Sequence, residues 1–339
     1  MRIILLGPQR RPTVDAAARS LGLDRPGPDD PNGPDGPGGP GGPVATITAG
    51  WQEREPDDQE LSTLLGGRAV NLSLYRRWLD VQDRDPGYAT GERELAGTVA
   101  ELQDLYLLRL DCALQAVYAV QRRVTGELGG AGQLRAEALA EAIAAVRELD
   151  AAHLRRVDNV RGEFFQRLPP HDRPVIAGHR AAVQGILGEA GALVIAGGHV
   201  GVLAAVLHLF NVAAALHQGA DRSPVIAWSA GAMALTDRIV LFGDRSPQGP
   251  GHPEVYGSGL SMLRDVVLLP HARSRMLLDD TPRMAVFARR FAPARCVLLD
   301  RGTRIELDSS DGVGSPGGRW PPGVRVIAED GRVTGLEAA

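Results

Sequence analysis

Short apolar runs that alternate with helical stretches constrain the fold of this chain more than any other feature. The runs contain few polar residues, and they fall at residues 2–6, 44–48, 69–74, 192–196, 225–228, 266–269 and 297–299. Strands that are apolar on both faces are typical of a mostly parallel sheet, because helices cover such a sheet on each side. We therefore predict an α/β fold with a mostly parallel sheet and helices on both of its faces.

Breaks in this rhythm divide the chain into three parts. The first part of the α/β core spans residues 1–91 and contains a segment, residues 24–43, with seven prolines and seven glycines. That composition cannot bury a core, so we expect a disordered loop there rather than a site. The second part of the core spans residues 169–339 and ends in a predicted hairpin around Asp330 and Gly331.

The middle part, residues 92–168, has a helical period instead. Apolar residues recur three or four positions apart on both sides of a glycine-containing break at residues 126–132. This spacing predicts two long amphipathic helices that fold back on each other as a helical-hairpin insertion. A packed insertion is favoured over a dedicated partner-binding surface, because apolar stripes are usually core. A homodimer formed through the hairpin stays open.

The basic residues of the chain exclude several kinds of chemistry. The 339 residues include no lysine, so all 37 basic side chains are arginines. A Schiff-base enzyme, a P-loop phosphate site and a Ser-Lys dyad each need a lysine ammonium group, and all three are excluded. The formal net charge of −4 also argues against nucleic acid as a partner.

The cysteines and the longest uncharged run bear on localisation. Cys112 and Cys296 are far apart and offer neither a disulfide framework nor metal-ligand spacing, so we expect a reducing cytoplasm and no metal. Residues 190–220 contain no Asp, Glu, Lys or Arg. A glycine pair interrupts this run, so we predict a buried strand and helix there rather than a membrane span.

One strand leads directly into a serine that has small neighbours. After the apolar residues 225–228 the chain continues Ser229-Ala230-Gly231-Ala232, where a helix is predicted. A tight strand-to-helix turn of this kind forms a nucleophile elbow, which exposes the serine hydroxyl. The backbone N–H of Ala230 would then point at a developing oxyanion. The alternative is an ordinary serine N-cap, and the local sequence favours neither interpretation.

A catalytic serine needs a base and a group that orients the base. His271 follows the apolar run at residues 266–269, which places it at a carboxyl edge where ligands bind in α/β folds. Among the carboxylates between Ser229 and His271, we choose Asp244 as the third member, with Glu254 as a close second. Gly198 ends another predicted strand within Gly197-Gly198-His199, and its bare backbone could supply a second oxyanion donor.

Taken together, four motifs resemble the S51 serine peptidases, the family of dipeptidase E and cyanophycinase. The motifs are Gly197-Gly198-His199, Trp228-Ser229-Ala230-Gly231-Ala232, Gly257-Ser258-Gly259-Leu260 and Leu269-Pro270-His271. The resemblance covers roughly residues 175–303 and implies a class I glutamine amidotransferase-like fold. It also implies that Ser229 attacks a peptide carbonyl, that His271 transfers the proton, and that the N–H groups of Gly198 and Ala230 hold the oxyanion.

Residues that differ from those of S51 members narrow the range of possible substrates. His199 stands where members commonly carry Asn or Asp, and Leu269-Pro270 replaces the polar pair of cyanophycinases, which argues against cyanophycin as the substrate. Glutamine amidotransfer is disfavoured because those relatives need a cysteine at the position of Ser229. Arg273 and Arg275 are candidates to receive a substrate carboxylate, together with His199 at the substrate end of the pocket.

We therefore expect a cytoplasmic serine hydrolase that cleaves a small peptide or isopeptide-like amide without a cofactor. One alternative is a catalytically inactive S51-like protein that binds a ligand or a partner. Another is an esterase of the α/β-hydrolase type, which shares the elbow and the chain order of serine, acid and histidine.

Overall fold

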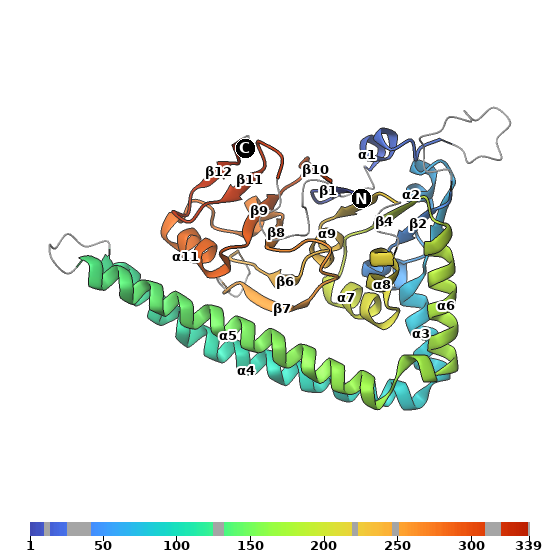
Figure 1. The fold of residues 1–339 in the computed structure, drawn as a ribbon, viewed down its shortest axis with the longest axis horizontal. Helices are drawn as coiled ribbons and strands as arrows, with labels where there is room; N and C mark the ends of the chain where they lie inside the picture. The colour runs from blue at the N-terminus through green and yellow to red at the C-terminus, as the bar shows by residue number, and fades with distance from the viewer. Residues whose placement is uncertain are drawn as a thin grey trace.

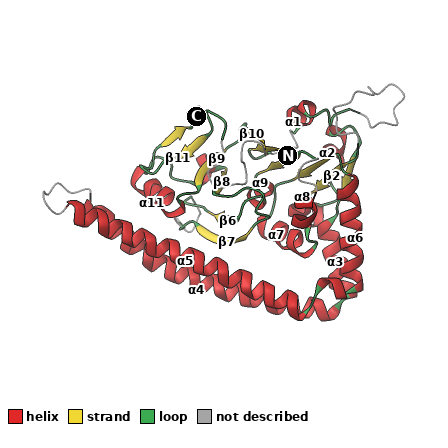
Figure 2. Ribbon diagram, in the orientation of Figure 1, coloured by secondary structure: helices red, strands yellow, loops and turns green. Residues whose placement is uncertain are grey.

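A computed structural model describes residues 1–9, 14–25, 42–124, 132–218, 223–245, 251–308 and 320–337. Most of the proline- and glycine-rich segment therefore lies outside the described residues. Two sheets, a two-stranded ribbon and a long pair of helices are the main parts of the described structure (Figure 1). Helices account for more of the described chain than strands do (Figure 2).

The larger sheet has six strands in the order β10-β1-β5-β4-β2-β3. Five of these strands run parallel, and the edge strand β10 pairs antiparallel with β1. The bounds are β1 (Arg2–Leu6), β2 (Val44–Ile47), β3 (Ala69–Asn71), β4 (Ala192–Ile195), β5 (Val225–Trp228) and β10 (Arg304–Asp308). This sheet confirms the predicted α/β class with mostly parallel strands.

Helices cover both faces of this sheet, as its apolar strands require. Ile3 and Leu5 of β1 point into one core, and Ile4 and Leu6 point into the other. Helices α3 (Leu74–Arg84), α6 (Pro174–Glu189) and α7 (Val200–Leu209) cover the first face, and α1 (Asp15–Ser20) and α2 (Gln59–Leu64) cover the second. Shorter helices follow β2, α5, α7 and β5, namely η1 (Ala49–Arg54), η2 (Pro170–Asp172), α8 (Val212–Gln218) and α9 (Ala230–Ala234).

The smaller sheet has four strands in the order β12-β11-β9-β8. Only β8 (Val266–Pro270) and β9 (Arg295–Leu299) are parallel, and β11 (Arg325–Ile327) and β12 (Val333–Gly335) form the predicted closing hairpin. The strand that carries His271 therefore belongs to a different sheet from the strand that carries Ser229. Two further helices, α10 (Ala272–Arg275) and α11 (Thr281–Phe291), lie between β8 and β9.

A two-stranded antiparallel ribbon joins the sheets to the long helices. The ribbon consists of β6 (Arg238–Leu241) and β7 (Glu254–Ser258), which the apolar runs did not predict. Below it, α4 (Pro86–Val124) and α5 (Gly132–Arg167) run side by side along the molecule (Figure 1). These two helices occupy the region where the helical period was found, and α4 begins before residue 92.

A buried ion pair fastens the hairpin to α11. The Arg290 guanidinium donates to both carboxylate oxygens of Asp150 at 2.7 Å, and the Tyr106 hydroxyl donates to the same carboxylate at 2.8 Å. Arg290 lies on α11, whereas Asp150 and Tyr106 lie on α5 and α4. Apolar residues of both helices also share a core with β8, β9 and α11. The hairpin is thus part of the packed molecule along its middle.

The long uncharged run forms β4, α7 and α8. Val194 of β4 and Leu203 of α7 are both fully buried, in the cores on the two faces of the larger sheet. Within the described ranges, no helix has the length and apolar character that a membrane crossing needs.

Candidate active site

Ser229 has the backbone of a nucleophile elbow. It directly follows β5, precedes α9, and adopts φ 50° and ψ −120°. Its side chain makes no capping hydrogen bond to α9, which distinguishes it from an ordinary serine N-cap. The Ser229 N–H donates to the Leu6 carbonyl at 3.3 Å, so the turn is fixed to the neighbouring strand β1. The hydroxyl is therefore free for a function other than capping.

Glycines surround Ser229 because a side chain would not fit. A Cβ added at Gly197 would lie 2.9 Å from the Ser229 Cβ, and one at Gly231 would lie 2.4 Å from the Ile195 carbonyl oxygen. Gly198 has φ 138° and is exposed, and a Cβ there would lie 2.3 Å from the Gly50 carbonyl oxygen. The turn after β4 thus lies directly against the serine, with the backbone of Gly198 open to solvent.

His271 occupies the corresponding place at the end of β8. It follows Pro270 and adopts a left-handed backbone, φ 60° and ψ 27°, before α10 begins. Helix α9, which starts next to Ser229, packs on β8. Non-glycine residues with positive φ at two strand ends are a form of backbone strain that clusters at functional sites.

The carboxyl ends of the two sheets meet at Gly7. The Gly7 N–H donates to the Thr303 carbonyl at 2.9 Å, and a Cβ added at Gly7 would lie 1.8 Å from the Asp300 carbonyl oxygen. Gly7 directly follows Leu6, the hydrogen-bond partner of Ser229. A continuous line of contacts therefore runs from Ser229 through Leu6 and Gly7 to Asp300.

Asp300 is the functional candidate that the sequence analysis missed. It directly follows β9, and because Pro270 pairs with Leu299, the next residues along the two strands are His271 and Asp300. One carboxylate oxygen of Asp300 accepts the Arg273 N–H at 3.0 Å, whereas the other, Oδ2, is buried without a hydrogen-bond partner among the described residues. The signal in the sequence was an aspartate placed directly after an apolar strand.

Several charges act on the imidazole of His271. Burial lowers the pKa of His271 below its ordinary value, the positive charge of Arg275 lowers it further, and the Asp300 carboxylate raises it. The net effect is a lowered pKa, so the imidazole is neutral at neutral pH. A neutral imidazole can accept a proton, which is what a general base must do.

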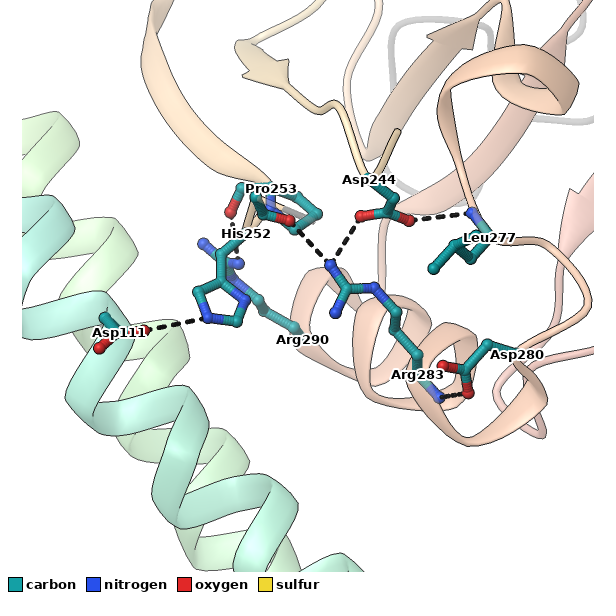
Figure 3. A network of polar contacts seen from close by, with 9 residues as sticks. Asp111, Asp244, His252, Pro253, Leu277, Asp280, Arg283 and Arg290 are labelled. Carbon is teal, nitrogen blue, oxygen red and sulfur yellow. Dashed lines mark hydrogen bonds and ion pairs between the residues drawn. The ribbon is translucent and has the colours of Figure 1, made fainter. Parts of the chain in front are cut away.

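Asp244, our choice from the sequence, has other partners. Its Oδ1 accepts a hydrogen bond from the Arg283 guanidinium at 2.6 Å, and its Oδ2 accepts the Leu277 N–H at 3.0 Å (Figure 3). The side chain is fully buried in this network, which His252 and Asp111 extend toward α4. Both oxygens of Asp244 are thus bound, one by Arg283 of α11 and the other by Leu277 in the loop before it, whereas Asp300 is the carboxylate that follows the strand next to His271.

Glu254, the second choice, faces the hairpin. Its Oε2 accepts a hydrogen bond from the Gln103 amide at 2.9 Å, and burial raises the pKa of its carboxyl group. Gln103 also bonds His153 of α5. Glu254 therefore links β7 to α4 and α5.

The three candidate substrate residues lie at the rim of these strand ends. His199 is exposed and caps α7, because its Nδ1 accepts the Val202 N–H at 3.2 Å. Arg273 and Arg275 are both exposed on α10, next to His271. The Arg273 guanidinium lies 3.7 Å from Asp300 Oδ2, so part of its charge is directed at that carboxylate.

Comparisons with known proteins found similarity to a solved structure at low identity. No family model matches the chain, and no curated protein matches it. Among solved structures, it is similar to the crystal structure of a peptidase from an acI-B1 Actinobacterium, with a TM-score of 0.39 and 12% identity over 99% of this chain and 94% of that chain. Within the described ranges, no group of three or more His, Cys, Asp or Glu side chains is placed to hold a metal ion.

Proposed function

We propose that this protein is a serine hydrolase that cleaves a peptide or isopeptide-like amide bond, as the S51 peptidases that its motifs resemble do. The observation that carries the proposal is the local structure around Ser229. It combines a strained backbone, an uncapped hydroxyl and glycine neighbours with a position on the line of contacts that leads to Asp300. These features are what a nucleophile elbow needs, and an N-cap needs none of them.

In this proposal Ser229 Oγ attacks the carbonyl carbon of the scissile amide while His271 takes the hydroxyl proton. The tetrahedral intermediate then collapses, the C–N bond breaks, and His271 gives the proton to the leaving amine. Water attacks the resulting acyl-enzyme ester in the same way, with His271 again as base, which releases the acid and restores Ser229. Asp300 holds the imidazole in the required tautomer and stabilises its charged form.

The oxyanion would be held by backbone N–H groups. Ala230 is the first residue of α9, so its N–H is one of those that a helix N-terminus leaves without an intrahelical acceptor. Gly198 brings bare, solvent-accessible backbone next to Gly197, which packs on the Ser229 Cβ. Two such donors stabilise a tetrahedral intermediate more than the planar substrate, which is the requirement for catalysis.

A fluorophosphonate probe tests the proposal, because it forms a covalent bond only with an activated serine. We expect mapping of the adduct to place it on Ser229 in the wild type, and we expect Ser229→Ala and His271→Ala to abolish labelling. Ser73→Ala is the matched control and should label as the wild type does, since Ser73 also precedes a helix with a positive φ of 50°.

The alternatives give different results in the same experiments. A folded wild-type protein that stays unlabelled contradicts the hydrolase and supports a non-catalytic binding protein. If Ser229 is labelled, dipeptides with N-terminal Asp and simple acyl esters are then compared as substrates. Hydrolysis of the peptides supports the peptidase, and hydrolysis of the esters alone supports the esterase.

A further inference from the structure

A pocket of about 530 Å³ lies where the base of the helical hairpin meets the larger sheet's helices. Its walls come from α3, the first turns of α4, the last turns of α5, α7 and β7. These elements form the corner where the hairpin reaches α3 and α6 (Figure 1). None of the groups that we assign to catalysis line this pocket.

The lining of the pocket is rich in aromatic side chains. The chain contains four tryptophans, five tyrosines and six phenylalanines, and six of these fifteen residues line the pocket. They are Tyr75, Trp78, Tyr88, Phe164, Phe165 and Tyr256. Several of them pack on one another, with ring centroids 5.4 Å apart for Tyr75 and Trp78 and 5.3 Å apart for Tyr88 and Phe164. An open pocket with such walls can bury the apolar body of a ligand.

One charged group in the pocket has a nitrogen atom without a hydrogen-bond partner among the described residues. The Nη1 atom of Arg161 is buried and has no hydrogen-bond partner among the residues that the structure describes. The guanidinium lies over Gly257, where a Cβ would come within 3.1 Å of Nη1. Burial lowers the pKa of Arg161, and Asp158 and Tyr256 partly offset this. The Asp158 carboxylate instead accepts the Ser258 hydroxyl at 2.8 Å. A buried, unpaired guanidinium nitrogen is costly unless an anion completes its hydrogen bonds.

The acidic group of the pocket is already satisfied. Glu92 accepts a hydrogen bond from the Trp78 indole N–H at 2.9 Å and another from the Gln82 amide. Burial raises the pKa of Glu92, and its hydrogen bonds from Trp78 and Gln82 partly offset this. A negatively charged ligand group beside Arg161 would therefore supply the hydrogen-bond acceptor that its Nη1 atom lacks.

We propose that this pocket binds a small molecule that has an aromatic or branched aliphatic body and a single carboxylate, with the carboxylate bound by Arg161. The aromatic walls take the body, and the planar guanidinium suits a carboxylate, which it can bind with two parallel hydrogen bonds. Gly201 lines the pocket two residues after His199, so the ligand would bind next to the glycine turn of the candidate active site. Binding itself does not require Ser229 to be catalytic.

Calorimetric titration of the full chain with 4-phenylbutyrate tests this proposal. The neutral isostere 4-phenylbutanamide has the same body without the charge. We expect saturable binding of the carboxylate, at least about tenfold tighter than that of the amide, because hydrogen bonds to a charged group carry the difference. Ser229→Ala should bind both probes as the wild type does, which separates this site from the proposed hydrolysis.

Substitutions test whether Arg161 causes the preference for the carboxylate probe over the amide probe. Arg161→Gln should abolish the preference for carboxylate over amide, whereas Arg156→Gln, an exposed arginine of the same helix, should retain it. Ala205→Trp fills the pocket from α7 and should weaken binding of both probes about tenfold or more. The proposal is overturned if the wild type gives no saturable heat with the carboxylate or binds both probes equally. It is also overturned if Arg161→Gln keeps the preference.

Discussion

Ser229, His271 and Asp300 each directly follow a buried strand, and the first two adopt a backbone that non-glycine residues avoid. Positive φ at such a residue costs about 1–3 kcal/mol and persists only where the surrounding structure imposes it. At Ser229 the close packing of Gly197 and the hydrogen bond from the Ser229 N–H to Leu6 hold the turn in place, and at Asp300 the close approach of Gly7 does so. The chain thus retains strain at the strand ends to which we assign catalysis.

The proposed role of Asp300 predicts that its substitution by asparagine slows the reaction of Ser229 strongly. Asp300→Asn keeps the size of the side chain but removes the charge that orients and stabilises the His271 imidazolium. We expect the rate at which a fluorophosphonate labels Ser229 to fall about 100-fold or more. Glu254→Gln is the control and should leave the rate unchanged, since Glu254 faces Gln103. Equal rates for Asp300→Asn and wild type would remove Asp300 from the site.

The charges around His271 predict the pH dependence of the same reaction. His271 must be neutral to act as base, and its pKa lies below 6.5, so labelling should persist to below pH 6.5 before it declines on acidification. Arg275→Gln removes a charge that lowers this pKa, so the midpoint should move to higher pH. Asp300→Asn removes one that raises it, so the midpoint should move to lower pH. Shifts in the opposite directions would show that another group titrates.

Reasoning from the sequence singled out Ser229 and His271 as candidates but not Asp300, for a physical reason. Ser229 has a local signature, because the tight turn demands small neighbours, and His271 stands directly after an apolar strand. Asp300 stands after an apolar strand too, yet only the pairing of β8 with β9 places it beside His271. The acid was sought between Ser229 and His271, and sheet order is not a property of local sequence.

At the scale of elements, α9 lies so close to β4 that only glycine fits between them. A Cβ at Gly231 would lie 2.4 Å and 2.7 Å from the carbonyl oxygens of Ile195 and Ala196. Gly231→Ala should therefore lower the free energy of unfolding by about 1–3 kcal/mol, measured by urea denaturation. Gly178→Ala in α6, where a Cβ meets nothing within 4 Å, should raise it by about 0.5–1 kcal/mol. A Gly231→Ala protein as stable as the wild type would contradict this packing.

A buried ion pair joins the hairpin to α11, in addition to the apolar core that they share. Arg290 is 3% exposed and Asp150 6% exposed, and removal of one partner leaves a buried charge without compensation. We expect Asp150→Asn to lower the free energy of unfolding by about 3–5 kcal/mol. Glu148→Gln, which breaks an exposed pair with Arg155 on the same helix, should change it little. Similar losses for the two variants would mean that Arg290 does not fasten the hairpin.

The search for apolar runs predicted strands that are buried on both faces and missed strands whose burial alternates. The run at residues 225–228 matches β5 in full because both of its faces are covered. β10, with the sequence Arg-Ile-Glu-Leu-Asp, alternates apolar and charged residues at the edge of the sheet, so a search for apolar runs missed it. The ribbon strand β7 was missed for a similar reason, since its burial alternates along the strand.

At the scale of the whole molecule, two sheets contribute to one candidate site. The alternation of strands and helices predicted the α/β class, but it does not contain the information that β8 and β9 leave the larger sheet and pair in a second one. The chain crosses back from β9 to β10, and this crossing brings Asp300 against Gly7 beside the strand that holds Ser229. The proposed hydrolase therefore depends on how the two sheets are joined.

The most direct measurement is a crystal structure of the protein after a phosphonate probe has reacted. Our account predicts a bond from Ser229 Oγ to phosphorus, with the phosphonyl oxygen accepting hydrogen bonds from the N–H groups of Ala230 and Gly198. It further predicts His271 between Ser229 and the Oδ2 atom of Asp300, within hydrogen-bond reach of both. An adduct on another residue, or an imidazole of His271 directed away from a modified Ser229, would contradict it.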